Sequence, residues 1–386
     1  MHQQNKTLFL IVFCQFCCTS LWFAGNSIVA DLIQVFSLPQ DFLSTLTSTV
    51  QLGFIIGTFL FAFLNISDRF EANYVFFVCA ALGSMFNVLL LFGFNTVNTL
   101  LVLRFLIGVS LAGIYPVGMK IAASQFSEGL GKYLGFLVGA LVLGTAFPHM
   151  LKGFALGLSW KFVLIFTSLI SLLGACLILC VPKAKAASLQ TIDMRLLFSV
   201  FRKKAFRNAA FGYFGHMWEL YTFWAFVPSM LMSYQEIHHD TFANVSILSF
   251  TIIGIGAFSC VLAGYLSIVF GLRKVAFCAL LMSACCCLLY PLFFLYASPF
   301  VFVLFLFFWS AVVIADSPLF SSLVAKSSSA ETRGTALTIV SCIGFFITII
   351  SIYSVAYLYD YIHLWSFMFL AVGPLLGLYF LTQKKV

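Results

Sequence analysis

Four ionisable residues lie well inside long apolar stretches of this chain, at Arg104, His216, Glu219 and Asp316. A charged side chain in hydrocarbon costs at least about 2–3 kcal/mol, so one that persists there usually serves a path for water, ions or solutes. His216 and Glu219 are three residues apart, which places them on one face of a helix. We predict that this pair titrates near neutral pH and carries a proton. The alternative is a structural glutamate that is hydrogen-bonded to Arg104 or to tyrosines.

Asp316 is the second candidate proton carrier. It lies deep in its apolar stretch, and the nearby Pro318 should loosen the helix around it. Similar prolines recur in other apolar stretches, and a helix that is interrupted in this way can bend. The prolines predicted to interrupt helices are Pro116, Pro148, Pro228 and Pro318.

Arg104 is the deepest cation of the chain. Tyr115 follows it by eleven residues and Gly108 by four, so all three share a helical face at 100° per residue. A guanidinium that is fixed toward a cavity can hold a carboxylate or phosphate through two parallel hydrogen bonds. The equally weighted alternative is an internal ion pair or a clamp on helix carbonyls that only holds the helix in place.

Further polar and aromatic residues fall within or at the ends of apolar stretches. Asn26 and Gln51 either contact a substrate or bridge helices. Trp224 is the one aromatic residue that we select as a candidate ligand contact, because aromatic residues at helical spacing usually serve packing. The residues expected at a membrane interface are Asp31, Lys120 and His149.

The composition of the chain is that of a membrane protein. The chain has 386 residues, of which 62% are hydrophobic and 8% charged, whereas about 25% of the residues in a soluble domain are charged. Twelve apolar stretches are long enough to cross about 30 Å of hydrocarbon. They cover approximately residues 8–36, 42–65, 74–93, 98–122, 130–153, 161–181, 206–234, 242–271, 274–296, 298–326, 331–355 and 362–381. We therefore predict an all-α, polytopic membrane protein with twelve spans.

The basic residues predict the orientation of these spans. Outside the fourth span there are eighteen Lys and Arg, and sixteen of them lie at the termini or in the loops that follow even-numbered spans. The positive-inside rule then places both termini in the cytoplasm. The net charge of +8 reflects this topology, and we expect no nucleic-acid partner. A basic cytoplasmic linker, residues 182–205, separates an N-terminal bundle, residues 1–181, from a C-terminal bundle, residues 206–386.

The two halves are related at an offset of 200 residues. The loop Leu64–Asn73 aligns with Gly264–Arg273, and Gly144 aligns with Gly344. Parallel repeats of six helices are a known plan of transporters, with the site between the halves. The chain is therefore expected to have two six-helix bundles that arose by duplication.

The loop motifs resemble those of the major facilitator superfamily. The loop signature G-x-x-x-D-R-x-G-R-R/K of that family is divided here, with Asp68 and Arg69 in the first copy and Gly264, Gly271 and Arg273 in the second. Arg104-x-x-x-Gly108-x-x-x-Ala112 also resembles its fourth helix. The resemblance implies the major facilitator fold, a gating role for these loop residues, and a central cavity that is lined by helices 1, 4, 7 and 10.

Three segments resemble a bacterial group placed near the nitrate/nitrite porters, namely Ser20–Ala24, Gly113–Lys120 and Gly212–Tyr221. The signatures of those porters are missing. There is no arginine in the second or eighth span, and the glycine-rich fifth span lacks their asparagine. The missing arginines argue against nitrate as the substrate.

Cysteine chemistry and cofactors are not expected. The clusters Cys14, Cys17 and Cys18, and Cys285–Cys287, lie in apolar stretches without histidine or carboxylate at ligand spacing, so we read them as small buried residues. The sequence has no nucleotide-binding loop, which excludes ATP as the energy source. We predict neither a metal nor a cofactor.

Together these features predict a monomeric secondary active transporter of the cytoplasmic (inner) membrane, and not an enzyme. We expect alternating-access uptake of a small organic anion or zwitterion, coupled to protons. One alternative is proton-driven efflux of a drug, metabolite or siderophore-like compound. A different class is a receptor or intramembrane enzyme on a transporter scaffold, for which His216 with Glu219 is the only pair that we can name, and it lacks a third ligand.

Overall fold

The structure is a computed structural model, and it describes residues 2–39, 41–92, 96–126, 130–155, 159–183, 200–328 and 333–383. Helices are the only regular elements within these ranges. The chain divides into two compact units, residues 1–192 and 193–386, each of which is described by itself. Most of the predicted linker, residues 184–199, lies outside the described residues.

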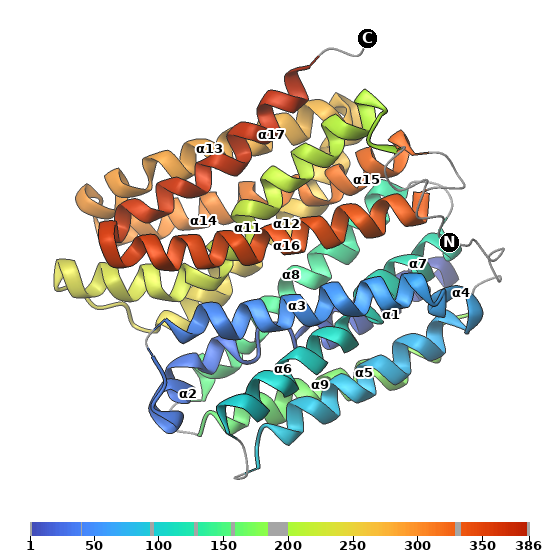
Figure 1. Ribbon diagram of the computed structural model, residues 1–386, viewed down its shortest axis with the longest axis horizontal. Coiled ribbons are helices and arrows are strands. Elements are labelled where there is room, and N and C mark those ends of the chain that lie inside the picture. Colours follow the sequence, from blue (N-terminus) through green and yellow to red (C-terminus); the bar gives the residue numbers. More distant parts are fainter. Residues whose placement is uncertain are drawn as a thin grey trace. The chain divides into compact units, whose positions relative to one another are not determined.

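The first unit contains six helical spans, two of which consist of more than one helix (Figure 1). The elements are α1 (His2–Thr19), η1 (Asn26–Ile28), α2 (Val29–Phe36), α3 (Phe42–Phe63), α4 (Ile66–Arg69), α5 (Ala72–Leu89), α6 (Val97–Ala112), α7 (Tyr115–Gln125), α8 (Leu130–Phe154) and α9 (Lys161–Ile178). The first span runs through α1, η1 and α2, and the fourth runs through α6 and α7. The short α4 follows the second span.

The second unit repeats this plan. Its elements are α11 (Lys204–His238), α12 (Val245–Phe270), α13 (Leu272–Tyr296), α14 (Pro299–Ala315), α15 (Ser317–Ser327), α16 (Arg333–Ile362), η2 (His363–Ala371) and α17 (Val372–Thr382). The tenth span runs through α14 and α15, and the twelfth runs through η2 and α17. The predicted all-α fold with twelve spans is confirmed.

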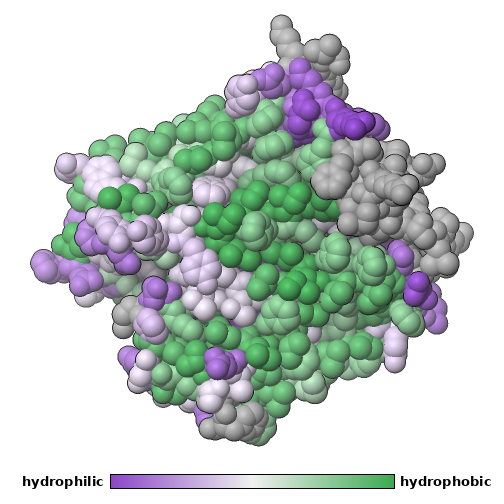
Figure 2. All heavy atoms as spheres, in the orientation of Figure 1, coloured by the Kyte–Doolittle hydropathy of each residue, from purple (hydrophilic) through white to green (hydrophobic). Residues whose placement is uncertain are grey.

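The spans are apolar enough to lie in a bilayer. Nine helical stretches within the described part of the chain meet the length and hydropathy that a membrane crossing requires. Large apolar side chains such as Phe258, Val269 and Tyr296 are exposed on them. On the face drawn in Figure 2, apolar residues cover the helices and the hydrophilic ones gather toward helix ends. A solvent of lipid accounts for this distribution.

Equivalent helices pack together in the two units. In the first unit α3 contacts α6 and α1 contacts α9, and in the second α12 contacts α14 and α11 contacts α17. The breaks in the fourth and tenth spans also correspond, because α7 and α15 begin 202 residues apart, at Tyr115 and Ser317, and each has proline as its second residue. Proline is tolerated there, since the first residues of a helix have no partner for their N–H groups.

Two of the four predicted interruptions are wrong. Pro148 lies inside the continuous helix α8, and Pro228 inside α11. A proline in a helix removes one hydrogen bond and bends the axis, but neighbouring helices can hold the two halves in line. A break that the prolines did not predict follows α1, where residues 20–25 are not in a regular helix.

Candidate functional site

His216 and Asp316 form a buried pair inside the second unit. His216 lies on α11, and Asp316 is the residue between α14 and α15. The imidazole Nδ1 is 2.7 Å from the carboxylate Oδ1, and both side chains are fully buried. The sequence predicted that His216 would act with Glu219, whereas the structure brings His216 to a residue that lies 100 positions later in the chain.

The helix break determines how Asp316 can act. Its main-chain carbonyl accepts hydrogen bonds from the N–H groups of Leu319 and Phe320, at 3.0 and 2.9 Å. Its side chain does not cap α15, although aspartate at this position usually does. The carboxylate is turned to His216 instead. Among the described residues, neither Oδ2 of Asp316 nor Nε2 of His216 has a hydrogen-bond partner.

Glu219 lies one helical turn further along α11, and its described partners are on two other helices. Ser283 Oγ and Cys287 Sγ of α13 donate to its carboxylate, the thiol over 3.3 Å. Trp309 Nε1 of α14 donates over 2.5 Å. Sequence reasoning missed all three donors. A helical serine or cysteine gives little signal, because its side chain can also bond to its own helix.

Arg104 holds the broken first span. Its Nη1 donates to the carbonyl of Leu21 over 3.2 Å and its Nη2 to that of Trp22 over 2.7 Å. Both carbonyls belong to the non-helical segment after α1. The side chain of Arg104 is fully buried. These contacts are those of a clamp on helix carbonyls, one of the two roles that the sequence left open.

The other predicted contact residues lie in different environments. Asn26 Nδ2 donates to Thr47 Oγ1 of α3 over 2.7 Å, which bridges η1 to the second span. Gln51 is buried on α3, and Tyr115 is half-buried at the start of α7. Trp224 belongs to the second unit, where its ring contacts Tyr221 edge-on. The structure therefore places Asn26, Gln51, Arg104 and Tyr115 in the first unit and Trp224 in the second.

The loop residues of the family motif serve as links between helices. Asn73, at the start of α5, donates to the carbonyl of Val181 over 2.7 Å. At the equivalent place in the second unit, Arg273 Nε donates to the carbonyl of Leu381 over 3.0 Å and its Nη2 to that of Gln383 over 2.8 Å. These bonds tie the third span to the end of the sixth and the ninth to the end of the twelfth.

The remaining motif residues surround these links. Gly271 adopts φ +88° between α12 and α13, a value that favours glycine. Gly264 is buried in α12, and Arg69 ends α4. The side chain of Asp68 lies outside the described residues.

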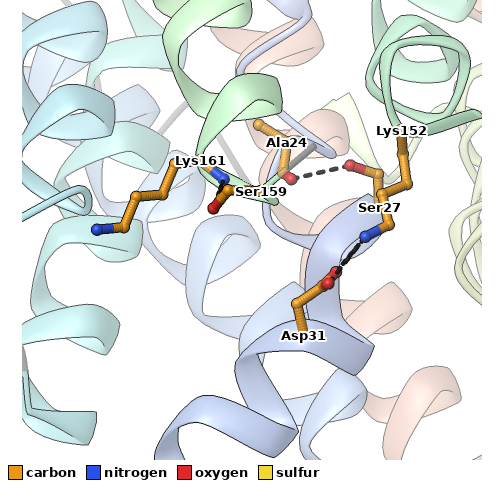
Figure 3. Close-up of polar contacts among 6 residues, drawn as sticks. All are labelled: Ala24, Ser27, Asp31, Lys152, Ser159 and Lys161. Atoms are coloured by element: carbon orange, nitrogen blue, oxygen red, sulfur yellow. Dashed lines mark hydrogen bonds and ion pairs between the residues drawn. The ribbon is translucent and has the colours of Figure 1, made fainter. Parts of the chain in front are cut away.

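Asp31 and Lys152 form an ion pair near the end of the first unit that contains α2 (Figure 3). Lys152 Nζ lies 2.6 Å from Asp31 Oδ2, and both side chains are about a quarter exposed. In the same region Ser27 Oγ donates to the carbonyl of Ala24 over 3.0 Å. His149 is buried within the first unit, and its interfacial place stays a prediction. It precedes Lys152 by one turn of α8.

The cysteines of α1 contribute to packing. Cys14, Cys17 and Cys18 are free and buried. A Cβ atom at Gly174 of α9 would lie 2.7 Å from Cys17 Cβ and 2.9 Å from Cys18 Sγ. The small side chains on both helices therefore allow α1 and α9 to approach closely.

Comparison with known proteins places this architecture in a family. The family model described as Major Facilitator Superfamily matches residues 9–211 and again residues 209–383. No curated protein sequence matches the chain. The narrower likeness to the nitrate/nitrite porters is not addressed by these matches and stays a prediction.

Two solved structures share the fold. The proton:xylose symporter XylE bound to 6-bromo-6-deoxy-D-glucose has a TM-score of 0.77 and 15% identity, over 98% of this chain and 94% of that one. A bacterial homologue of the human lysosomal transporter Spinster, inward-facing and unoccupied, has a TM-score of 0.65 and 15% identity, over 98% of this chain and 96% of that one. At such identities the likeness establishes the fold alone. The two family matches and the duplicated bundles show that this chain is a multi-pass membrane transporter of the Major Facilitator Superfamily.

Proposed function

We propose that this secondary transporter is coupled to protons through the ionisable groups of its second unit. The observation that carries the proposal is the full burial of His216, Glu219 and Asp316 in one six-helix bundle. Among the described residues of this unit, no Lys or Arg is buried with them. Carboxylates and histidines in such positions are typical of proton relays in transporters. A proton is the smallest counter-charge that can neutralise a buried carboxylate during a transport cycle.

The nature of the cargo is a separate part of the proposal. The sequence predicted a small organic anion or zwitterion because Arg104 is the deepest cation. Both terminal nitrogens of Arg104 donate to main-chain carbonyls, so its described contacts do not favour an anion over a neutral solute. We therefore propose a small organic solute that is taken up together with protons. Efflux of a drug, metabolite or siderophore-like compound is the alternative direction.

Transport into proteoliposomes tests the coupling. Purified protein is reconstituted with an imposed pH gradient, acidic outside, and accumulation is measured for anionic, zwitterionic and neutral solutes. We expect one class to accumulate against its own gradient and the accumulation to stop when a protonophore removes the pH gradient. Accumulation only under the opposite pH gradient would indicate efflux, and accumulation that ignores the pH gradient would overturn proton coupling.

Matched variants assign the effect to the second unit. We expect the double variant Glu219→Gln, Asp316→Asn to lose pH-driven accumulation, because neither amide can take up a proton. Asp31→Asn is the control, since it makes the same chemical change at a partly exposed carboxylate of the first unit. Equal losses in both variants would remove the support for the proposal.

A further inference from the structure

We infer that the transported proton is exchanged at the His216–Asp316 pair, and that Glu219 is a positioning group that keeps its hydrogen bonds throughout. This inference rests on the proposed proton coupling and deepens it by separating two carboxylates that the sequence treats alike. Three features of the second unit support it, and each distinguishes one carboxylate from the other.

The first feature is the hydrogen bonding of each carboxylate. Both oxygens of Glu219 have donors, with Trp309 and Cys287 on Oε1 and Ser283 on Oε2. An indole N–H can only donate, so Oε1 must remain an acceptor as long as Trp309 faces it. Protonation of Glu219 would therefore fall on Oε2 and would require the Ser283 hydroxyl to turn from donor to acceptor, which changes an existing hydrogen bond.

The His216–Asp316 pair, by comparison, has hydrogen-bonding atoms without a described partner. Only Nδ1 and Oδ1 face one another, whereas Nε2 of His216 and Oδ2 of Asp316 have no hydrogen-bond partner among the described residues. Both atoms are buried, where an unpaired polar atom costs about 1–3 kcal/mol. An imidazole can take up a proton on one nitrogen while the other stays bonded, so the pair has free positions at which a proton, a water molecule or a solute group can be exchanged.

The second feature is the backbone on which each group lies. Glu219 and its donors are within the continuous helices α11, α13 and α14, which fix their separations. Asp316 is the junction between α14 and α15, and the following Pro318 cannot donate a main-chain hydrogen bond. A change at Asp316 can therefore alter the angle between α14 and α15 without repacking a whole helix.

The third feature is an alternative partner for the Asp316 carboxyl group. Asp316 occupies the position that precedes α15, where an aspartate or asparagine side chain usually bonds to main-chain N–H groups of the first turn. In the structure it faces His216 and makes no such bond. When a proton binds the Asp316 carboxylate, the carboxylate loses its charge and its attraction to His216 weakens, so the carboxyl group is free to turn to the start of α15. Protonation would then be linked to the bend of the tenth span.

The titratable groups around the His216–Asp316 pair do not prevent it from exchanging a proton. The titratable side chains nearest the pair are Glu219 and Tyr213 on α11, Cys260 on α12 and Cys287 on α13, and the ring of Tyr213 lies 6.1 Å from that of His216. Cys260 donates to the carbonyl of Ile314 over 3.6 Å, and Cys287 donates to Glu219. Among the described residues, none of these neighbours is a Lys or Arg that could hold Asp316 permanently charged.

Infrared difference spectroscopy tests the inference without a known substrate. The full-length protein is titrated in lipid, and the carboxyl C=O band of protonated acids is followed between about pH 5 and pH 9. We expect a band that titrates in the wild type, that is lost in Asp316→Asn, and that keeps at least half of its amplitude in Glu219→Gln. Asp31→Asn is the control, and Asp316→Glu should restore a titrating band.

Two further variants keep the test decisive if Asp316→Asn fails to fold. His216→Gln removes the partner and should move the midpoint of the titration by at least about one pH unit, because an opposite charge at this distance has that effect. Ser283→Ala removes one donor from Glu219 and should leave the midpoint in place.

The outcomes separate the two proposals. Loss of the band in Glu219→Gln with retention in Asp316→Asn would overturn the exchange site, while proton coupling would stand. A wild type with no titrating band, together with transport that does not depend on the pH gradient, would overturn both the exchange site and the proton coupling.

Discussion

The two units are built on one helical plan, but their interiors differ in charge. In the first unit the buried ionisable side chains among the described residues are Arg104 and His149, and Arg104 donates to the carbonyls of a broken first span. In the second unit the equivalent seventh span is the unbroken helix α11, and it bears His216 and Glu219 facing acids and donors. The comparison indicates that duplication fixed the scaffold, while the interior chemistry of each unit diverged.

The two units share one hydrogen bond at equivalent positions. Asn73 and Arg273 lie 200 residues apart, and they donate to the carbonyls of Val181 and Leu381, which are also 200 residues apart. The two side chains differ in charge and length, but they make the same connection. A main-chain carbonyl at a helix end needs a donor in either unit, and the identity of that donor is secondary.

A contact between corresponding helices shows how the packing of the two units differs. In the first unit Gln15 of α1 lies over Gly118 of α7, where an added Cβ would be 2.0 Å from the amide oxygen. In the second unit the glycine is on the other helix of the pair, because Gly212 of α11 lies under the ring of Phe320 of α15. A Cβ atom added at Gly212 would be 2.3 Å from a ring carbon of Phe320. Each pair needs one glycine, and the two units place it on opposite helices.

The largest expected effect on stability comes from disrupting the contact between Gln15 and Gly118. Gly118→Phe alone places a ring where Gln15 already lies, and we expect a destabilisation of about 3 kcal/mol or more. The double variant Gln15→Gly, Gly118→Phe recreates the arrangement of the second unit and should recover a large part of that loss. Thermal unfolding in detergent measures both. A double variant that is no more stable than Gly118→Phe would show that the two contacts are not equivalent.

The next effect concerns the clamp of the first unit. Arg104→Gln and Arg104→Lys should each destabilise the protein by about 1–3 kcal/mol, because neither side chain can donate to both carbonyls with the geometry of a guanidinium. The melting temperature measures the loss. If Arg104→Lys kept full stability and lost only solute binding, Arg104 would be an anion ligand and the contrast between the units would need revision.

A smaller effect on stability is expected for the hydrogen bonds of Asn73 and Arg273, which link helices within each unit. Asn73→Ala and Arg273→Ala each leave a helix-end carbonyl without its donor, and we expect about 1 kcal/mol for each. Because the two bonds lie in separate units, the losses should add in the double variant. Denaturant titration is the measurement, with Tyr74→Ala as an exposed control next to Asn73. Strong non-additivity would mean that the links do more than hold their own units.

The smallest effect is expected at Asp31 and Lys152. Both side chains are partly exposed, and such ion pairs contribute about 0–1 kcal/mol. Exchanging the charges in Asp31→Lys, Lys152→Asp should therefore return stability to within a few tenths of a kcal/mol of the wild type. The two single variants should differ little from it. A large effect that salt does not screen would point to a role beyond an ion pair.

The sequence predicted the repeated helical plan well, because hydropathy and loop charge depend on residues that are close in the chain. It also identified the buried ionisable residues, since a charge in an apolar stretch stands out. It did not predict their partners. His216 was matched with Glu219 at helical spacing, whereas Asp316 approaches it through the fold.

The break after α1 was missed for a similar reason. No proline marks residues 20–25, and the donor to the freed carbonyls is Arg104, about eighty residues away. Ser283 and Cys287 were missed because neither is unusual in an apolar helix. Long-range polar contacts of this kind become visible only when the helices are placed side by side.

The ratio of protons to solute moved per cycle tests the central claim most directly. It is measured in proteoliposomes that contain a pH-sensitive dye, for the wild type and for the variant Glu219→Gln, Asp316→Asn. The account predicts a fixed, non-zero ratio for the wild type, and solute movement without proton movement, or no movement, for the variant. A wild-type protein that moves its solute with no accompanying protons would contradict the account.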